Sequence, residues 1–312
     1  MSTLIIPLVS TGNVPQLTVD LLLHNEHTNY KYVKDLNAQF LHPFLGPLDK
    51  LSGEQGISKL YTNDDASTSS KINVKQFSTP IELYYSKKEN TYIIQQRTPI
   101  VPTYENNFIN SAILPLLKEY KNEIKKIIVL DSIGPYEMQV ADNNNDSDNS
   151  IYIEDKIFSS RVSIGEKNDS NSIEDIDKKY LALSLLSSPS DTAIKSNNID
   201  KLLLNFTSRK ENFQLGLDRT RFAFKLIYHI LHFNIHLDLS YFDMFVYEGD
   251  NSQDAAYLVE ILYTYNYKNM VSENSANRIK KLTIKDLSPP ISWKGLYGFG
   301  EVPDSMEQGL YI

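Results

Sequence analysis

Three histidines, His229, His232 and His236, follow one another at spacings of three and four residues. On a helix these spacings place the imidazoles along one face, where they could coordinate a metal ion such as zinc. The nearest carboxylate is Asp238, and the neighbouring residues include tyrosine and phenylalanine. An amphipathic packing face explains this pattern better than a metal site, so we expect no metal and no cofactor here.

A second group of charged residues falls at or just beyond the ends of expected strands. Open α/β sheets place ligand sites at such positions, and a hydrolase or phosphorylase would use the crevice there. Helix capping and structural ion pairs explain the same residues without chemistry, and the chain has neither a G-x-S-x-G elbow nor a P-loop lysine. We therefore expect no enzymatic activity, and a nucleoside or amide hydrolase remains the alternative. The residues concerned are Arg97, Asp131, Glu248 and Asp250.

The sequence stops at Leu310, Tyr311 and Ile312. An aliphatic side chain, a phenol ring and a terminal carboxylate could together plug a pocket of another protein, with the carboxylate seated on a buried lysine. We expect these three residues to form the binding site of the chain. Upstream, the single tryptophan, Trp293, lies among glycines and aromatic residues. We expect this strap to pack on the core of its own domain and to anchor the tail.

Composition narrows the class of protein. The chain has 312 residues, of which 41% are hydrophobic, enough for a substantial buried core. Its net charge of −8 opposes binding to nucleic acid and to anionic membranes. The absence of cysteine rules out disulfides and thiol chemistry and fits a reducing compartment. The apolar run Leu4–Val9 is too short for a signal peptide or membrane span. We expect a cytoplasmic protein that can also be nuclear.

Strand and helix signals alternate along the first half. Short continuous apolar runs are typical of strands buried on both faces of a sheet, and a polar turn between two such runs predicts a hairpin. Pro15 suits the first turn of a helix that Asn13 could cap. The expected elements are strands at Leu4–Val9, Ile81–Ser86, Thr91–Gln96 and Lys126–Asp131, and helices after Asn13 and around Phe108–Leu117.

The second half follows the same order. It predicts a helix over Phe222–Leu239, a strand over Tyr241–Tyr247 and a helix over Ala255–Tyr265, with Asn251 or Ser252 as the cap. Recurring strand and helix signals favour an α/β fold.

We expect a single α/β domain with an irregular carboxyl-terminal arm. Polar stretches rich in Asn, Ser and Asp cannot bury enough apolar surface to order themselves, so they predict disordered inserts within that domain. The expected domain covers residues 1–287, the inserts lie near 62–71, 142–150 and 166–177, and residues 288–312 form the strap and the pocket-docking tail.

Five sequence blocks, spread over almost the whole chain, occur in a distinctive order. The blocks are LIIPLVSTGNVPQLTVDLLL (residues 4–23), IIQQRTP (93–99), IIVLDS (127–132), EGDNS (248–252) and PISWKGLYGFGE (290–301). Together they resemble the proteasome assembly chaperone 2 family in its fungal form, and the opening block and the block around the tryptophan are the most specific. The polar inserts depart from the compact pattern of that family.

The resemblance implies a three-layer α/β/α sandwich, similar to nucleoside phosphorylases and hydrolases but without their catalysis. It also implies a heterodimer with proteasome assembly chaperone 1 on the outer face of the alpha ring of the proteasome core particle. In that family, hydrophobic-Tyr-any tails enter pockets between adjacent alpha subunits, and Leu310, Tyr311 and Ile312 match this pattern position by position. The function expected is thus a non-enzymatic assembly chaperone; a generic tail-docking adaptor is a further alternative.

Overall fold

A computed structural model describes the central part of the chain and several segments around it. The described residues are 2–25, 27–51, 58–63, 72–73, 75–134, 157–163, 221–232, 237–270 and 287–293. The predicted inserts 142–150 and 166–177, nearly all of 62–71, and the tail residues Leu310, Tyr311 and Ile312 lie outside them.

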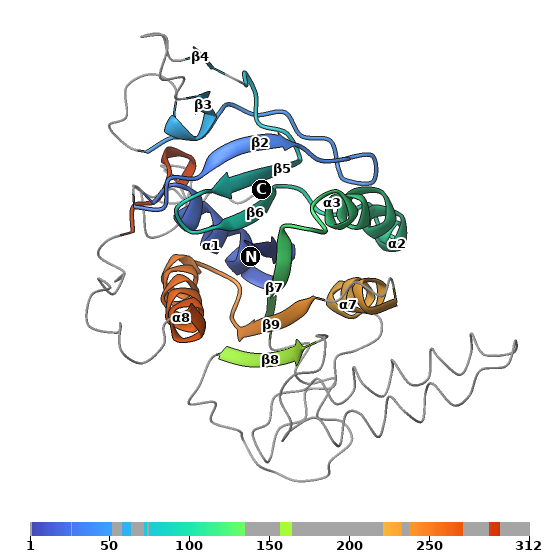
Figure 1. The fold of residues 1–312 in the computed structure, drawn as a ribbon. Helices are drawn as coiled ribbons and strands as arrows, with labels where there is room; N and C mark the ends of the chain where they lie inside the picture. The colour runs from blue at the N-terminus through green and yellow to red at the C-terminus, as the bar shows by residue number, and fades with distance from the viewer. Residues whose placement is uncertain are drawn as a thin grey trace, which may run out of the picture.

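Seven described strands form one mixed sheet (Figure 1). They are β1 (Ser2–Pro7), β2 (Lys31–Asp35), β5 (Ile81–Ser86), β6 (Thr91–Gln96), β7 (Ile124–Ile133), β8 (Ile157–Ser163) and β9 (Asp238–Phe245). Their order is β2-β5-β6-β1-β7-β9-β8, and a separate pair joins β3 (Thr62–Asn63) to β4 (Ile72–Asn73). The central strands β6, β1, β7 and β9 are parallel, whereas β2, β5 and β8 are antiparallel to their neighbours. The predicted strands of the first half and the β5–β6 hairpin are confirmed.

Helices cover both faces of this sheet (Figure 1). They are α1 (Val14–Leu23), α2 (Glu105–Phe108), η3 (Ile109–Ile113), α3 (Leu114–Glu119), α7 (Phe222–His232) and α8 (Ser252–Met270), with short turns η1 (Thr11–Asn13), η2 (Lys59–Tyr61) and η6 (Ile291–Trp293). Side chains alternate between the faces along each strand, so Leu4 and Ile6 of β1 pack with α2, η3, α3 and α7. Ile5 packs instead with α1, α8, η2 and Trp293. The α/β prediction is confirmed.

The predicted amino-terminal caps can be checked at the first turns of α1 and α8. Asn13 stands at the N-cap of α1 with φ of 53°, but its side chain makes no capping hydrogen bond. Pro15 lies in the first turn of α1, as predicted. At α8 the capping side chain is Asp250, whose carboxylate accepts a hydrogen bond from the backbone N–H of Ser252 at 3.0 Å. Asn251, one of the two predicted caps, is the residue directly before α8. The first free N–H group of the helix is satisfied by its neighbour Asp250 instead.

The helix predicted over Phe222–Leu239 is wrong at its end. Helix α7 is described over Phe222–His232, residues 233–236 lie outside the described residues, and Asp238 already belongs to β9. Leu237, Leu239 and Tyr241 all lie in the core on the α7 side of the sheet. This spacing of two is the period of a strand, and pairing of the whole of β9 with β7 fixes it. None of the described helices is long and apolar enough to span a lipid bilayer.

Candidate functional site

The candidate metal face is only partly described. His229 lies on α7, where its Nε2 is 3.2 Å from the side-chain oxygen of Asn106 on α2. His232 ends the helix, and His236 falls outside the described residues. Within the described chain, no three side chains of the metal-binding types come together.

The strand-end charges do not form one crevice. Ile93 of β6 belongs to the core beneath α1 and α8, so by alternation Arg97, just beyond β6, lies on that side of the sheet. Val129 of β7 belongs to the core beneath α3 and α7, so Asp131 lies on the opposite side. Glu248 is exposed in the loop between β9 and α8. The arrangement considered for a hydrolase is therefore not assembled by these residues.

Hydroxyl groups occupy the carboxyl ends of β1 and β7, where an open α/β sheet places its ligand. The hydroxyls of Ser10 and Ser132 are 2.8 Å apart, and the Ser132 hydroxyl donates to the backbone oxygen of Thr11 at 2.6 Å. Beside them, a Cβ atom at Gly12 would come within 2.3 Å of the Asn251 side-chain nitrogen. The loops after β1 and β9 thus pack directly against each other at this end of the sheet.

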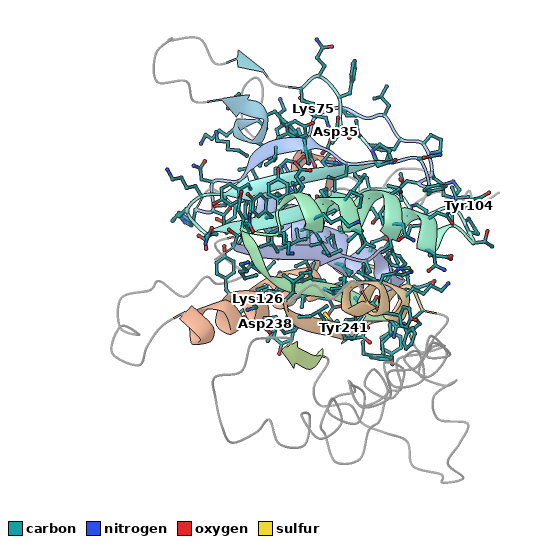
Figure 2. All side chains as sticks on the ribbon, turned by 45° about the vertical axis from the view of Figure 1, so that its right-hand side comes forward. Asp35, Lys75, Tyr104, Lys126, Asp238 and Tyr241 are labelled. Atoms are coloured by element: carbon teal, nitrogen blue, oxygen red, sulfur yellow. The ribbon has the colours of Figure 1, made fainter. Side chains whose placement is uncertain are left out.

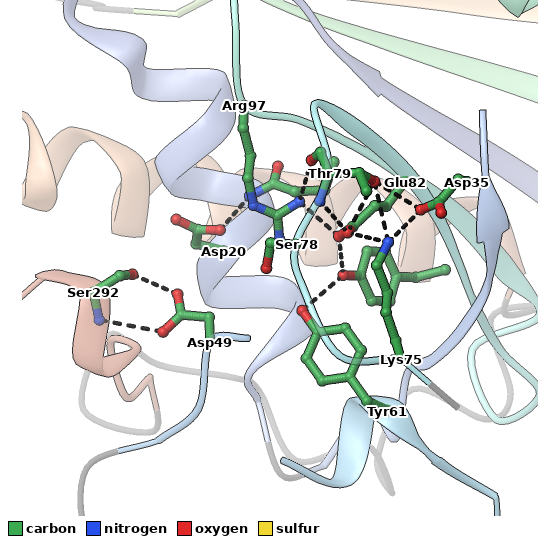
Figure 3. A network of polar contacts seen from close by, with 12 residues as sticks. Asp20, Asp35, Asp49, Tyr61, Lys75, Ser78, Thr79, Glu82, Arg97 and Ser292 are labelled. Carbon is green, nitrogen blue, oxygen red and sulfur yellow. Dashed lines mark hydrogen bonds and ion pairs between the residues drawn. The ribbon is translucent and has the colours of Figure 1, made fainter. Parts of the chain in front are cut away.

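A buried polar network surrounds Glu82 of β5 (Figure 3). Glu82 has no exposed side-chain surface, and its carboxylate contacts Lys75 at 2.5 Å and Arg97 at 2.6 Å. The Tyr84 hydroxyl donates to the same carboxylate at 2.5 Å, and the backbone N–H of Thr79 donates at 2.8 Å. The structural ion pair predicted for Arg97 is confirmed, and its partner is Glu82.

Charges determine the protonation state of this network. Burial alone would raise the pKa of Glu82, but the Arg97 charge and the hydrogen bonds from Lys75 and Tyr84 outweigh it and lower that pKa. Lys75 also pairs with Asp35 of β2, and its ammonium lies 4.5 Å from the centre of the Tyr32 ring. Figure 2 shows Lys75 and Asp35 together near β2, away from Asp238 and Tyr241. Through Lys75, the network connects the edge strand β2 to the loop before β5.

The described strap is tied to this side of the fold at several points. Trp293 is 2% exposed, and its indole N–H donates to the Asp20 carboxylate on α1 at 3.0 Å. Asp20 also accepts a hydrogen bond from Gln95 of β6. Ser292 donates to Asp49 through both its backbone N–H, at 3.2 Å, and its hydroxyl. The prediction that the strap packs on the core of its own domain is confirmed for its described part, which ends at Trp293.

A second buried charge cluster lies across the sheet. Asp131 of β7 and Asp243 of β9 are register partners, and Arg221, just before α7, reaches the first at 2.6 Å and the second at 3.4 Å. The Tyr241 hydroxyl donates to Asp131 at 2.8 Å. Burial, and then repulsion by Asp131, raises the pKa of Asp243 to about 7. Two carboxyls thus share one guanidinium among the described residues.

We expect Asp243→Asn to stabilise the protein at pH 8 and to flatten its stability profile between pH 4 and 7. In the parent, folded Asp243 keeps its proton up to about pH 7. An unfolded aspartate loses its proton near its ordinary value of 3.8, so the free energy of unfolding falls as the pH rises between these values. Denaturant unfolding at pH 5 and pH 8 measures this difference. Glu119→Gln on the surface is the control, and equal pH slopes in parent and Asp243→Asn would contradict the assignment.

Sequence reasoning missed Glu82, Asp20 and Arg221 as partners. A signal for Glu82 was present, because alternation puts it on the same face of its strand as Tyr84, among residues that are otherwise apolar. A charge at an inward-facing strand position requires a buried partner. No comparable signal marks Arg221, which stands 90 residues from Asp131.

The sequence and the structure are similar to those of several known proteins. Residues 4–193 match the PAC2 family. Proteasome assembly chaperone 2 of Saccharomyces cerevisiae is 30% identical over 309 residues, covering 97% of each chain. Among solved structures, Pyrococcus furiosus PbaA, an archaeal homolog of proteasome-assembly chaperone, is 13% identical with a TM-score of 0.44 and coverage of 86% of this chain and 82% of its own. A PAC2 family protein from Streptomyces avermitilis is 8% identical, with a TM-score of 0.39 and coverage of 90% and 100%. The chain therefore belongs to the PAC2 family.

Proposed function

We propose that this protein is a non-enzymatic chaperone for assembly of the 20S proteasome core particle. The observation that carries the proposal is the 30% identity to yeast proteasome assembly chaperone 2, which runs over 97% of both chains. Identity of this extent covers the sheet, both helical layers and the strap. The cytoplasm, and also the nucleus, are the proposed compartments.

The proposed assembly is a heterodimer with proteasome assembly chaperone 1 on the outer face of the alpha ring. Leu310, Tyr311 and Ile312 are its docking site in a pocket between alpha subunits. Tyr311 supplies an apolar ring and a hydroxyl, and the terminal carboxylate forms a charge-assisted hydrogen bond with a pocket lysine. The role of the folded domain is to carry this tail and to meet the partner chaperone.

Two tails, one from each half of the heterodimer, give bivalent attachment. The second docking event is then intramolecular, so tails of modest affinity bind firmly as a pair yet release one at a time. Occupied pockets are closed to other proteins that use similar tails. This delays premature capping of the ring and discourages wrong pairing of alpha rings.

The proposed resemblance to nucleoside phosphorylases extends to the fold and not to the catalysis. Two observations support a non-enzymatic protein over the hydrolase alternative. Arg97 and Asp131 lie on opposite faces of the sheet, and mutual hydroxyl contacts of Ser10 and Ser132 occupy the strand ends. A generic adaptor would share the docking tail but would recover neither a sister chaperone nor alpha subunits.

We expect affinity purification of the chain, tagged at its amino terminus, to recover a chaperone of similar size together with alpha subunits of immature core particles. The tag is placed there because a carboxyl-terminal tag would block the docking carboxylate. A matched preparation lacking residues 310–312 should retain the sister chaperone and lose most of the alpha subunits. Recovery of mature, fully capped particles alone would contradict an assembly role.

A further inference from the structure

Three described segments around the β5–β6 hairpin contain no aspartate, glutamate, lysine or arginine, although 22% of the residues of the chain are charged. They are residues 36–48, 76–81 and 98–104. Depletion of charged residues together with enrichment in aromatic ones distinguishes the core of a protein–protein interface from the rest of a protein surface.

Backbone hydrogen bonds join these three segments to one another. Gly46 and Ser78 exchange a pair of bonds, with N–H to oxygen distances of 3.1 and 2.9 Å. The N–H of His42 donates to the backbone oxygen of Pro99 at 3.1 Å. Segments that are far apart in the sequence therefore form one surface, which we name the uncharged face.

Large apolar side chains project from the uncharged face. Of the seven large hydrophobic side chains that are exposed in the described chain, four belong to it, and Leu45 is the most exposed of them. Figure 2 shows Tyr104 at the outer edge of the fold. The four are Phe44, Leu45, Phe77 and Tyr104.

The exposed rings are held in place by their neighbours. The Phe44 ring lies so close to Gly46 that a Cβ atom there would come within 2.7 Å of the ring. The Tyr104 ring stacks on Phe40, with centroids 5.4 Å apart and planes 16° apart. Thr103, beside it, has a φ of 74°, which a β-branched residue adopts only when the surrounding structure imposes it. Rings that are ordered before binding lose little conformational freedom when a partner covers them.

Charged residues border each of the three segments on both sides, and all six already have a polar partner within the chain. The pairs are Lys75 with Asp35 and Glu82, Arg97 with Glu82, Ser292 with Asp49, and Lys225 with Glu105. A charged group of a binding partner would therefore lose its water here without gaining a counter-charge. The surface that fits the uncharged face is itself apolar and free of charge.

We propose that the uncharged face binds an apolar, uncharged surface of the sister chaperone; this inference rests on the proposed function. A second copy of this chain fits less well, because two molecules with a net charge of −8 each repel one another. The alpha ring also fits less well, because the proposed attachment to it is releasable. Interfaces between subunits that stay together are the more hydrophobic class.

The test measures the affinity of the full-length chain for the sister chaperone by calorimetric titration, with variants at Leu45. Leu45→Asp and Leu45→Lys each place an unpaired charge in the proposed interface, so each should weaken binding about thirtyfold or more. Leu45→Met keeps an apolar side chain of similar volume and should bind like the parent. Opposite effects of the Asp and Lys variants would show that the partner surface is charged, and would overturn the proposal.

Tyr247→Asp is the matched control. Tyr247 lies in the loop after β9, outside the uncharged face, and it is 67% exposed against 70% for Leu45. This variant should bind the sister chaperone like the parent. Phe77→Asp is a second variant in the face, in case the Leu45 variants do not fold, and it should weaken binding as they do. Parent-like binding by Leu45→Asp and Phe77→Asp would overturn the proposal.

Two further measurements identify the occupant of the face. Leu45→Asp heterodimers that retain the sister chaperone at parent affinity but lose alpha rings would assign the face to the ring and overturn the proposal. Sedimentation in which Leu45→Asp abolishes self-association of the parent, with the affinity for the sister chaperone unchanged, would assign it to a second copy and also overturn it. Absence of any binding between the parent and the sister chaperone would instead overturn the proposed heterodimer.

Discussion

Tyr311→Ala should weaken binding to alpha rings by tenfold or more. The substitution removes both the ring and the hydroxyl from the proposed plug, and adding one residue after Ile312 should do comparable damage. The extension moves the carboxylate away from its lysine, and a hydrogen bond to a charged group contributes about 1.5–3 kcal/mol. This corresponds to a loss of roughly tenfold to more than a hundredfold. Titration of the heterodimer against immobilised alpha rings measures the change.

Tyr311→Phe is the matched control, because it keeps the ring and removes only the hydroxyl; its effect should be milder. The melting temperature should stay the same in all three variants, since a tail that docks into another protein is expected to add nothing to the stability of its own domain. Parent-like binding by both the extended and the alanine variants would disprove tail docking. A loss of binding that accompanies unfolding would also count against it.

Glu82→Ala should lower the free energy of unfolding by about 3–5 kcal/mol. The substitution leaves the buried cations of Lys75 and Arg97 without their shared carboxylate. Because interactions with these groups lower the pKa of Glu82, its stabilising contribution is present above its ordinary value of 4.5. It is lost as the pH falls through the lowered folded value. Denaturant unfolding at pH 7 and pH 3 measures both effects.

The surface pair of Lys34 and Glu119 is the control for Glu82. Its atoms are 2.5 Å apart, as close as those in the buried network, but the two side chains are 33% and 54% exposed. Exposed pairs contribute about 0–1 kcal/mol, so Lys34→Ala should cost little. Similar losses from Lys34→Ala and Glu82→Ala would show that burial of the network does not determine its strength.

Much of the sheet could be predicted because its inner strands are continuous apolar runs. The parallel strands β1 and β7 are buried on both faces, and only a strand within a covered sheet combines short length with unbroken hydrophobicity. The boundary between α7 and β9 could not be predicted, because apolar residues continue from the helix into the strand. The helical period of 3.6 residues and the strand period of two both fit that apolar run, and pairing with β7 decides between them.

Local patterns indicate only one of the two charge networks. Glu82 meets Arg97 across a hairpin, a separation that strand pairing can suggest. Arg221 and Asp131 are brought together only by the arrangement of α7 against the sheet. A single sequence contains the residue types of such a pair but not the distance between them. For this reason the sequence suggested that the strand-end charges share one crevice, although Arg97 and Asp131 lie on opposite faces of the sheet.

The bond between Asp20 and Trp293 joins positions 273 residues apart. At a translation rate of about 5–20 residues per second, roughly 14–55 s pass between synthesis of the carboxylate and synthesis of its indole partner. Helix α1 can form early, but the bond to Asp20 forms only after Trp293 has been synthesised. Until then this side of the core lacks a side chain that the folded protein buries there, so its packing is completed late in synthesis.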